Sequence, residues 1–284
     1  MTTDPNDRSS ALASLGEQKT RRRLISGMAL APAGANVIMQ LSRLPIGHAI
    51  AHSSVDSGAL AKHPVKRTRT TLAFIMIALF GTDHERSVMR SQVSTQHRRA
   101  NKGNESTVAF DTFSPELQRW VAACMHRGVI DAVSFLHGPP NEEELSALLA
   151  MSSRFATTLQ VPIDMWPATP SDYEELWRAS LGEVTFDEVT RGYLLGLASL
   201  RFLPFPLDRI LGPAHRFLTT GFLPPLFRDQ LGLAWSPRRQ RRFERIKVGL
   251  RVVNRLLPRP IREFPWNLVE RDTRRRIRRH QSIV

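Results

Sequence analysis

The stretch 63–97, HPVKRTRTTLAFIMIALFG followed by TDHERSVMRSQVSTQH, decides the fold. It begins with basic residues, becomes an apolar helix, and is interrupted at Gly81. The second part opens with a capping box, in which the side chains of Thr82 and Glu85 bond free N–H groups at a helix start. The stretch therefore predicts two consecutive helices, over residues 64–80 and 83–99.

Two stripes bring polar residues to one side of these helices. Arg67 and Thr71 are four residues apart. The same spacing separates Met89, Val93 and His97, so each set shares one face of its helix. The pattern predicts that an arginine, a hydroxyl and an imidazole point inward from two consecutive helices. From the residues alone, His97 is either a satisfied core histidine or a ligand.

The rest of the chain also predicts helices. Ser114-Pro115-Glu116 is a helix start, and Gly138 ends the apolar stripe that follows it. Further predicted helices start at Asn141, near Ser171, at a second capping box formed by Thr185–Glu188, at Pro213 (with a break before Leu231), at Ser236-Pro237 and at Trp266. We find no run of alternating β-branched residues. The prediction is an all-α fold, a single multi-helix globular domain.

Charge is concentrated near the C-terminus. Of the formal net charge of +14, twelve charges come from residues 238–279, which hold sixteen Lys/Arg and four Asp/Glu. We therefore divide the chain into a disordered basic leader (1–23), a helical catalytic domain (24–265) and a basic C-terminal tail (266–284). Because the remainder is nearly neutral, no nucleic-acid partner is expected for the whole protein.

The single cysteine and the apolar runs limit the cellular setting. Cys124 has no partner for a disulfide within the chain, and the longest apolar run, 72–80, is too short to span a bilayer. Residues 20–25, TRRRLI, are similar to a twin-arginine export signal, but the following segment runs directly into the predicted fold. A cytoplasmic protein that can associate with a membrane is expected, with export by the twin-arginine signal as the alternative.

Common catalytic motifs do not occur in the sequence. There is no G-x-G-x-x-G, P-loop, G-x-S-x-G or H-E-x-x-H, and no E-x-x-H pair that would supply half of a di-iron ligand set. What remains for an all-α chain is the inward histidine, His97.

Four segments in order resemble one family. The pattern Arg67-x-x-x-Thr71, an apolar helix, the Gly81-Thr82 break and His97 resembles the signature of rubber oxygenases (latex-clearing proteins) and MpaB-type oxygenases. The other resembling segments are Asn36–Leu41 with Pro45–Ser53, Leu117–Ala123, and Leu223–Arg228 with Trp235. The resemblance covers roughly residues 30–265, most of the chain.

The resemblance implies a cofactor and site residues. In rubber oxygenases the signature histidine is the proximal axial ligand of haem b, which carries over to His97 as the metal ligand. Arg67 and Thr71 then match residues that bind the cofactor or support catalysis. The expected function is that of a haem b-dependent oxidoreductase, an oxygenase that uses molecular oxygen on an apolar, lipid- or terpenoid-like substrate.

Several positions depart from the family pattern. Where the family often has a glutamate before the residue matched by Ser53, this chain has His52, which we expect to act as a catalytic acid/base. The other departures are Thr70 for a distal lysine, Phe110 and Ser114 for a tyrosine and an aspartate, and Ala122 for a histidine. These differences make cleavage of polyisoprene itself an unlikely activity.

The basic helix after Ser236 leaves two interpretations open. Its apolar residues could pack on the core while the arginines are solvated, or the helix could contact an anionic membrane. The alternative function is therefore a non-catalytic helical protein that binds an anionic membrane or a nucleic acid through this region.

Overall fold

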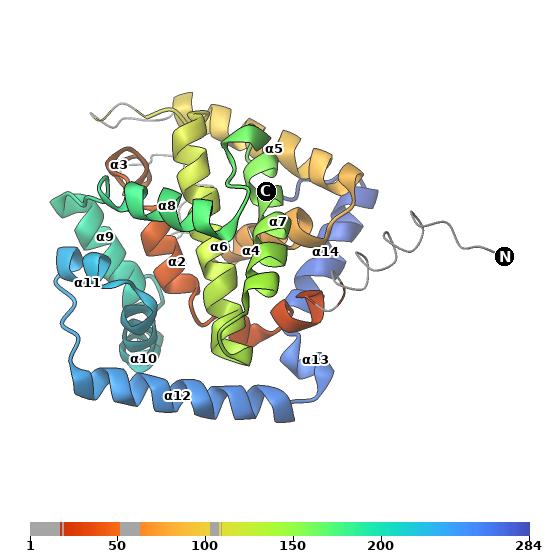
Figure 1. Cartoon of the computed structure of the whole chain (residues 1–284). Coiled ribbons are helices and arrows are strands. Elements are labelled where there is room, and N and C mark those ends of the chain that lie inside the picture. Colours follow the sequence, from red (N-terminus) through yellow and green to blue (C-terminus); the bar gives the residue numbers. More distant parts are fainter. Residues whose placement is uncertain (1–17, 19, 52–62, 103–107, 109) are drawn as a thin grey trace.

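The computed structural model describes residues 18, 20–51, 63–102, 108 and 110–284, and no strand occurs in these ranges (Figure 1). The predicted all-α, multi-helix globular fold is confirmed. In chain order the helices are η1 (Gly27–Leu30), α2 (Ala33–Gln40), α3 (Leu44–Ala51), α4 (Pro64–Phe80), α5 (Asp83–Lys102), α6 (Pro115–His137), α7 (Glu142–Thr158), η3 (Ile163–Met165), α8 (Pro170–Leu181), α9 (Glu188–Ala198), α10 (Leu207–Phe222), α11 (Pro225–Leu231), α12 (Pro237–Leu256), α13 (Arg259–Arg262) and α14 (Trp266–Arg278).

Helix α6 lies at the centre of the fold, where it contacts α2, α7, α8 and α12 (Figure 1). It begins as predicted, because the Ser114 hydroxyl accepts a hydrogen bond from the Leu117 N–H at 3.3 Å. It ends at Gly138, whose φ of 96° is strained for any residue with a Cβ. The wide apolar stripe between these ends buries side chains against several neighbouring helices at once.

Helices α4 and α5 are the two consecutive helices predicted from the stretch 63–97, and they contact each other. The capping box is present: the Thr82 N–H donates to Glu85 at 2.8 Å, and the Glu85 N–H donates to the Thr82 hydroxyl at 3.2 Å. At Gly81 a Cβ would lie 2.5 Å from the Ile77 carbonyl oxygen, so the tight turn requires glycine.

Buried aromatic side chains fasten the helices through their polar atoms. The Trp120 indole donates to the Met39 carbonyl at 3.1 Å, and the Trp266 indole donates to the Ser26 carbonyl at 2.9 Å. The Tyr173 hydroxyl donates to the Ala123 carbonyl at 3.1 Å. Each ring thus buries apolar area without leaving a donor unsatisfied.

Two predicted local features differ from the structure. Thr185 does not cap a helix; α9 instead starts after Asp187, whose carboxylate accepts from the Thr190 N–H at 2.7 Å. Asp187 lies closer to the apolar pattern and is an equally good capping residue. Pro213 neither starts nor breaks a helix, because α10 continues through it. Pro213 and Arg209, one turn earlier, are both exposed, so water can satisfy the carbonyl that loses its partner.

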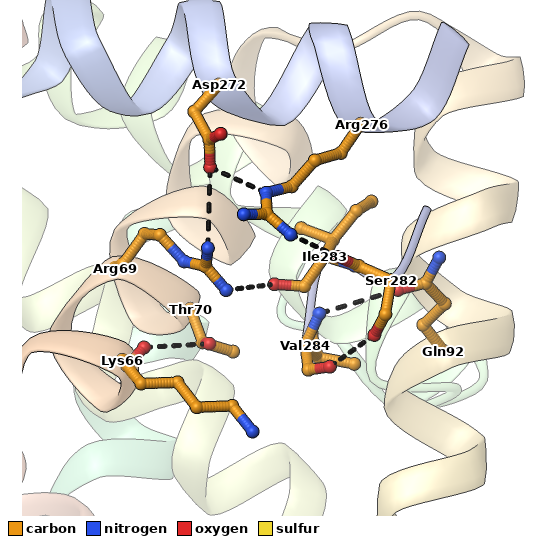
Figure 2. A network of polar contacts seen from close by, with 9 residues as sticks. All are labelled: Lys66, Arg69, Thr70, Gln92, Asp272, Arg276, Ser282, Ile283 and Val284. Atoms are coloured by element: carbon orange, nitrogen blue, oxygen red, sulfur yellow. Dashed lines mark hydrogen bonds and ion pairs between the residues drawn. The ribbon is translucent and has the colours of Figure 1, made fainter. Parts of the chain in front are cut away.

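Residues 266–284, which we expected to form a basic tail, pack against the helical body. Helix α14 contacts α4, and Val269, Thr273, Ile277 and Ile283 are buried. Figure 2 shows how the C-terminal residues contact α4 and α5. Arg69 of α4 pairs with Asp272 at 3.6 Å, and Gln92 of α5 accepts from the Ile283 N–H at 2.7 Å.

Substituting Gln92 by alanine is expected to lower the free energy of unfolding by about 1–2 kcal/mol, because the Ile283 N–H would lose its acceptor in a partly buried position. Urea denaturation followed by circular dichroism measures this change. Ser87 is exposed on the same helix, so Ser87→Ala is the control. Equal stability of the two variants would contradict the assigned contact.

The first described residues also pack into the fold. Arg21 pairs with Glu270 at 2.6 Å, Arg23 pairs with Glu144, and Leu24 and Ile25 are buried. These contacts join residues 20–25 to α14 and α7. No helix in the described ranges combines the length and the apolar character that crossing a membrane requires.

Candidate functional site

Arg67 and His97, separated by thirty positions in the sequence, interact electrostatically in the folded protein. Arg67 lies near the start of α4, and His97 lies near the end of α5. The Arg67 charge contributes to lowering the pKa of His97. That these two side chains belong to one functional site stays a prediction.

His97 is held as a neutral imidazole. Burial, followed by the charge of Arg67, lowers its pKa from 6.5 to about 4. Nδ1 is buried without a hydrogen-bond partner, and neither ring nitrogen is bonded to another described residue. The ring packs edge-on against Phe113, with centroids 5.9 Å apart. A neutral imidazole with unused nitrogen lone-pair capacity is the form that ligates a metal.

Arg67 is a cation without a counter-ion among the described residues. Its side chain is exposed to solvent, yet desolvation by the surrounding protein lowers its pKa. Tyr193 opposes this effect by raising the pKa. A guanidinium in such a place can bind a carboxylate supplied by a ligand.

Tyr193 of α9 belongs to this group, and the sequence analysis missed it. Burial raises the pKa of its hydroxyl, and Arg67 lowers it in part. Tyr193 is half-buried. At Gly192, the residue before it, an added Cβ would have no other atom within 4 Å. The site therefore draws on three helices: α4, α5 and α9.

Thr71 lies one turn after Arg67 on α4 and is partly buried. Its hydroxyl makes no hydrogen bond to another described residue. The preceding Thr70, which stands where rubber oxygenases have a lysine, donates instead to the Lys66 carbonyl at 2.9 Å. Thr71 thus shares the Arg67 side of α4 and has no structural hydrogen bond of its own to a described residue.

His52, the predicted acid/base, lies outside the described residues. His48, four residues earlier on α3, is described and lies 3.5 Å from Asp187 of the α9 start. His48 and His52 would share a face only on a helix that included residue 52, and the described part of α3 ends at Ala51.

The segment after α5 fixes the end of the helix that carries His97. The Thr112 hydroxyl donates to the His97 carbonyl at 3.2 Å, and the Thr112 N–H donates to the Asn101 side chain at 3.0 Å. These bonds limit movement of the last turns of α5, and with them the position of the imidazole.

The other family departures have structural roles here. Ser114 caps α6, and Ala122 is completely buried within that helix. Phe110 packs against the hydrophobic core. Among the described residues, no three His, Cys, Asp or Glu side chains gather in the way that a metal site formed by protein ligands alone requires.

Comparison with known proteins identifies the family. Residues 21–253 match the family described as "ER-bound oxygenase mpaB/B'/Rubber oxygenase, catalytic domain". Two uncharacterized proteins, one from Mycobacterium bovis and one from Mycobacterium tuberculosis, are each 42% identical over 250 residues, covering 88% of this chain and 98% of theirs. No solved structure matches the chain.

The chain belongs to the mpaB/rubber oxygenase catalytic-domain family, and the match confirms the resemblance seen in the sequence. The matched range contains α4, α5 and α9, which carry Arg67, His97 and Tyr193. It ends within α12, so α13, α14 and the final residues of this chain lie beyond it.

Proposed function

We propose that this protein is a haem b-dependent oxygenase that acts on an apolar, lipid- or terpenoid-like substrate, with His97 as the proximal iron ligand. The single observation that carries the proposal is the Arg67–His97 pair: a neutral, unbonded imidazole next to a cation without a counter-ion. The oxygenase class rests on family membership.

The residues present fit a haem. An imidazole must be neutral to serve as the axial ligand of haem iron, and burial together with Arg67 holds His97 in that form above about pH 4. The haem propionates are carboxylates, and Arg67 is an arginine available to bind one bidentately. Met89 and Val93, which precede His97 on its helical face, are buried and supply an apolar wall.

Each side chain has a separate task in this proposal. When bound, the haem supplies a redox-active iron that reacts with dioxygen. His97 holds and orients the cofactor, and Arg67 anchors its edge. The Thr71 hydroxyl is placed to orient a polar group of the ligand. Tyr193 and His52 are the candidate proton donors, since a phenol and an imidazole can each hold and release a proton.

The apolar substrate class is supported by the helix that carries Arg67. Thr71 and Ile75 follow Arg67 at four-residue spacing, and both are only partly covered, whereas most of the later residues of α4 are buried in the core. The partly covered, apolar Ile75 favours a hydrocarbon over a charged substrate. Polyisoprene is not proposed, because Thr70 replaces the lysine of the rubber oxygenases.

Haem content of the full chain, expressed with haem available, tests the proposal. We expect a coloured protein with a Soret band and about one haem per chain. Folded protein that stays colourless after incubation with hemin would overturn the haem assignment. If such protein still bound anionic vesicles, the alternative of a non-catalytic membrane-binding protein would be favoured.

A further inference from the structure

Helix α12 exposes large apolar side chains on the side that faces away from the protein. Its inner side is packed: Phe243 is buried, and buried Asn254 accepts from the Ser26 hydroxyl at 2.6 Å. Val248, Val252 and Leu256 are spaced by four and lie on the opposite side of the helix. Leu256 is 77% exposed.

The exposed apolar residues continue into the next turns of the chain. Ile261 of α13 is 61% exposed and Phe264 is 56% exposed. Figure 1 shows α12 along one edge of the molecule, with α13 directly after its end. We call this surface the α12–α13 face, which consists of Arg241, Arg245, Val248, Val252, Arg255, Leu256, Ile261 and Phe264.

The same face is strongly cationic. Residues 238–264 contain ten Lys/Arg and two Glu. Both glutamates are paired within the segment, Glu244 with Lys247 at 3.1 Å and Glu263 with Arg259 at 2.5 Å. Arg241, Arg245 and Arg255 are exposed on the outer side and form no ion pair with another described residue. Their charges are therefore available to an external anion.

We propose that the α12–α13 face docks the protein on an anionic membrane surface. An amphipathic helix that combines exposed Val, Leu and Ile with arginine matches the boundary between lipid headgroups and acyl chains, because both the charges and the apolar groups find partners there. A nucleic acid would satisfy the arginines but leave Leu256 and Ile261 in water. A second copy of this chain would bring two cationic faces together.

The docking requires neither haem nor catalysis, so it is tested separately from the proposed function. The full chain is mixed with equimolar phosphatidylglycerol–phosphatidylcholine vesicles and with pure phosphatidylcholine vesicles, and bound protein is measured by flotation. We expect binding to the anionic vesicles only. Added salt should weaken it, because charges near the surface are screened over about 8 Å at physiological ionic strength.

Two double variants separate the apolar and charge contributions. Leu256→Glu with Ile261→Glu is expected to weaken binding by more than about 100-fold, since it removes inserted apolar groups and adds repulsion. Arg241→Gln with Arg245→Gln is expected to weaken binding about 30-fold. All four side chains are exposed, so folding should be retained, which circular dichroism verifies. Ile163, 61% exposed on η3, supplies the control Ile163→Glu.

Several results would overturn the proposal. These are absence of binding to anionic vesicles, equal binding of the control and the Leu256→Glu/Ile261→Glu variant, or equal binding to neutral vesicles. Binding to duplex DNA in place of vesicles would assign the face to nucleic acid. A concentration-dependent dimer in parent protein that does not bind vesicles would assign it to self-association.

Discussion

Substituting His97 by alanine is expected to remove the haem from the protein while the helical circular dichroism signal stays unchanged. The imidazole would be the only iron ligand contributed by α5, and nothing in its neighbourhood on that helix can replace it: Val93, one turn earlier, is apolar. Loss of an outer-shell partner typically costs a metal site 10- to 100-fold in affinity, so loss of the ligand itself should weaken haem binding by more than about 100-fold.

Folding should survive this substitution. The His97 ring makes no hydrogen bond to another described residue, so its removal leaves no donor or acceptor unsatisfied. Hemin titration followed at the Soret band measures the affinity. His84→Ala is the matched control, because His84 is an exposed histidine on the same helix. Haem content and spectrum in His97→Ala equal to those of the control would show that the ligand lies elsewhere.

Local sequence signals predicted the two site helices well. The α4 bounds agree with the predicted 64–80, because a proline at the helix start, an apolar face and a glycine at the end all act within a few residues. The capping box at Thr82 agrees for the same reason. The box predicted at Thr185 was wrong, since Asp187 offered a competing cap two residues later and local pattern could not decide between them.

The site itself could be predicted only in part. Arg67 and His97 lie on two consecutive helices, so helix periodicity was enough to predict that both belong to the same part of the fold. Tyr193 reaches the same place from α9, nearly a hundred residues later than His97. Its position depends on how α9 packs, which no local pattern of the sequence contains. The inward packing of residues 266–284 was missed for a similar reason, because the high arginine content of α14 hides its four-residue apolar stripe.

Acidification of the haem-free protein from pH 7 to pH 4 is expected to lower its free energy of unfolding by several kcal/mol. His126 is buried beside Tyr173 and bonds the Ser152 hydroxyl at 2.9 Å. Burial, and then the charge of Arg127, lowers its pKa from 6.5 to about 3. Between these values the unfolded chain binds a proton that the folded protein does not, so stability falls as pH falls through this window.

The two buried histidines act in the same direction. By pH 4, His126 alone should cost about 3 kcal/mol, and His97, with a pKa of about 4, should contribute a similar loss. Urea denaturation at intervals between pH 7 and pH 4 measures the slope. His126→Phe, which cannot titrate, should have a shallower slope than the parent. The exposed-site variant His84→Phe is the control, and an unchanged slope in His126→Phe would contradict the neutral form of His126.

Asp131 on the same helix makes the experiment sharper, because its effect has the opposite sign. Burial raises its pKa from 3.8 to about 6, although Arg127, 3.8 Å away, and Lys247 lower it. As the pH falls, the folded protein therefore binds a proton before the unfolded chain does. The contribution of Asp131 to the free energy of unfolding rises as the pH falls from 6 to 4. Asp131→Asn removes this gain, so its stability should fall more steeply than that of the parent over that interval. A shallower slope in Asp131→Asn would mean that the carboxylate is already ionised and paired with Arg127 at pH 6.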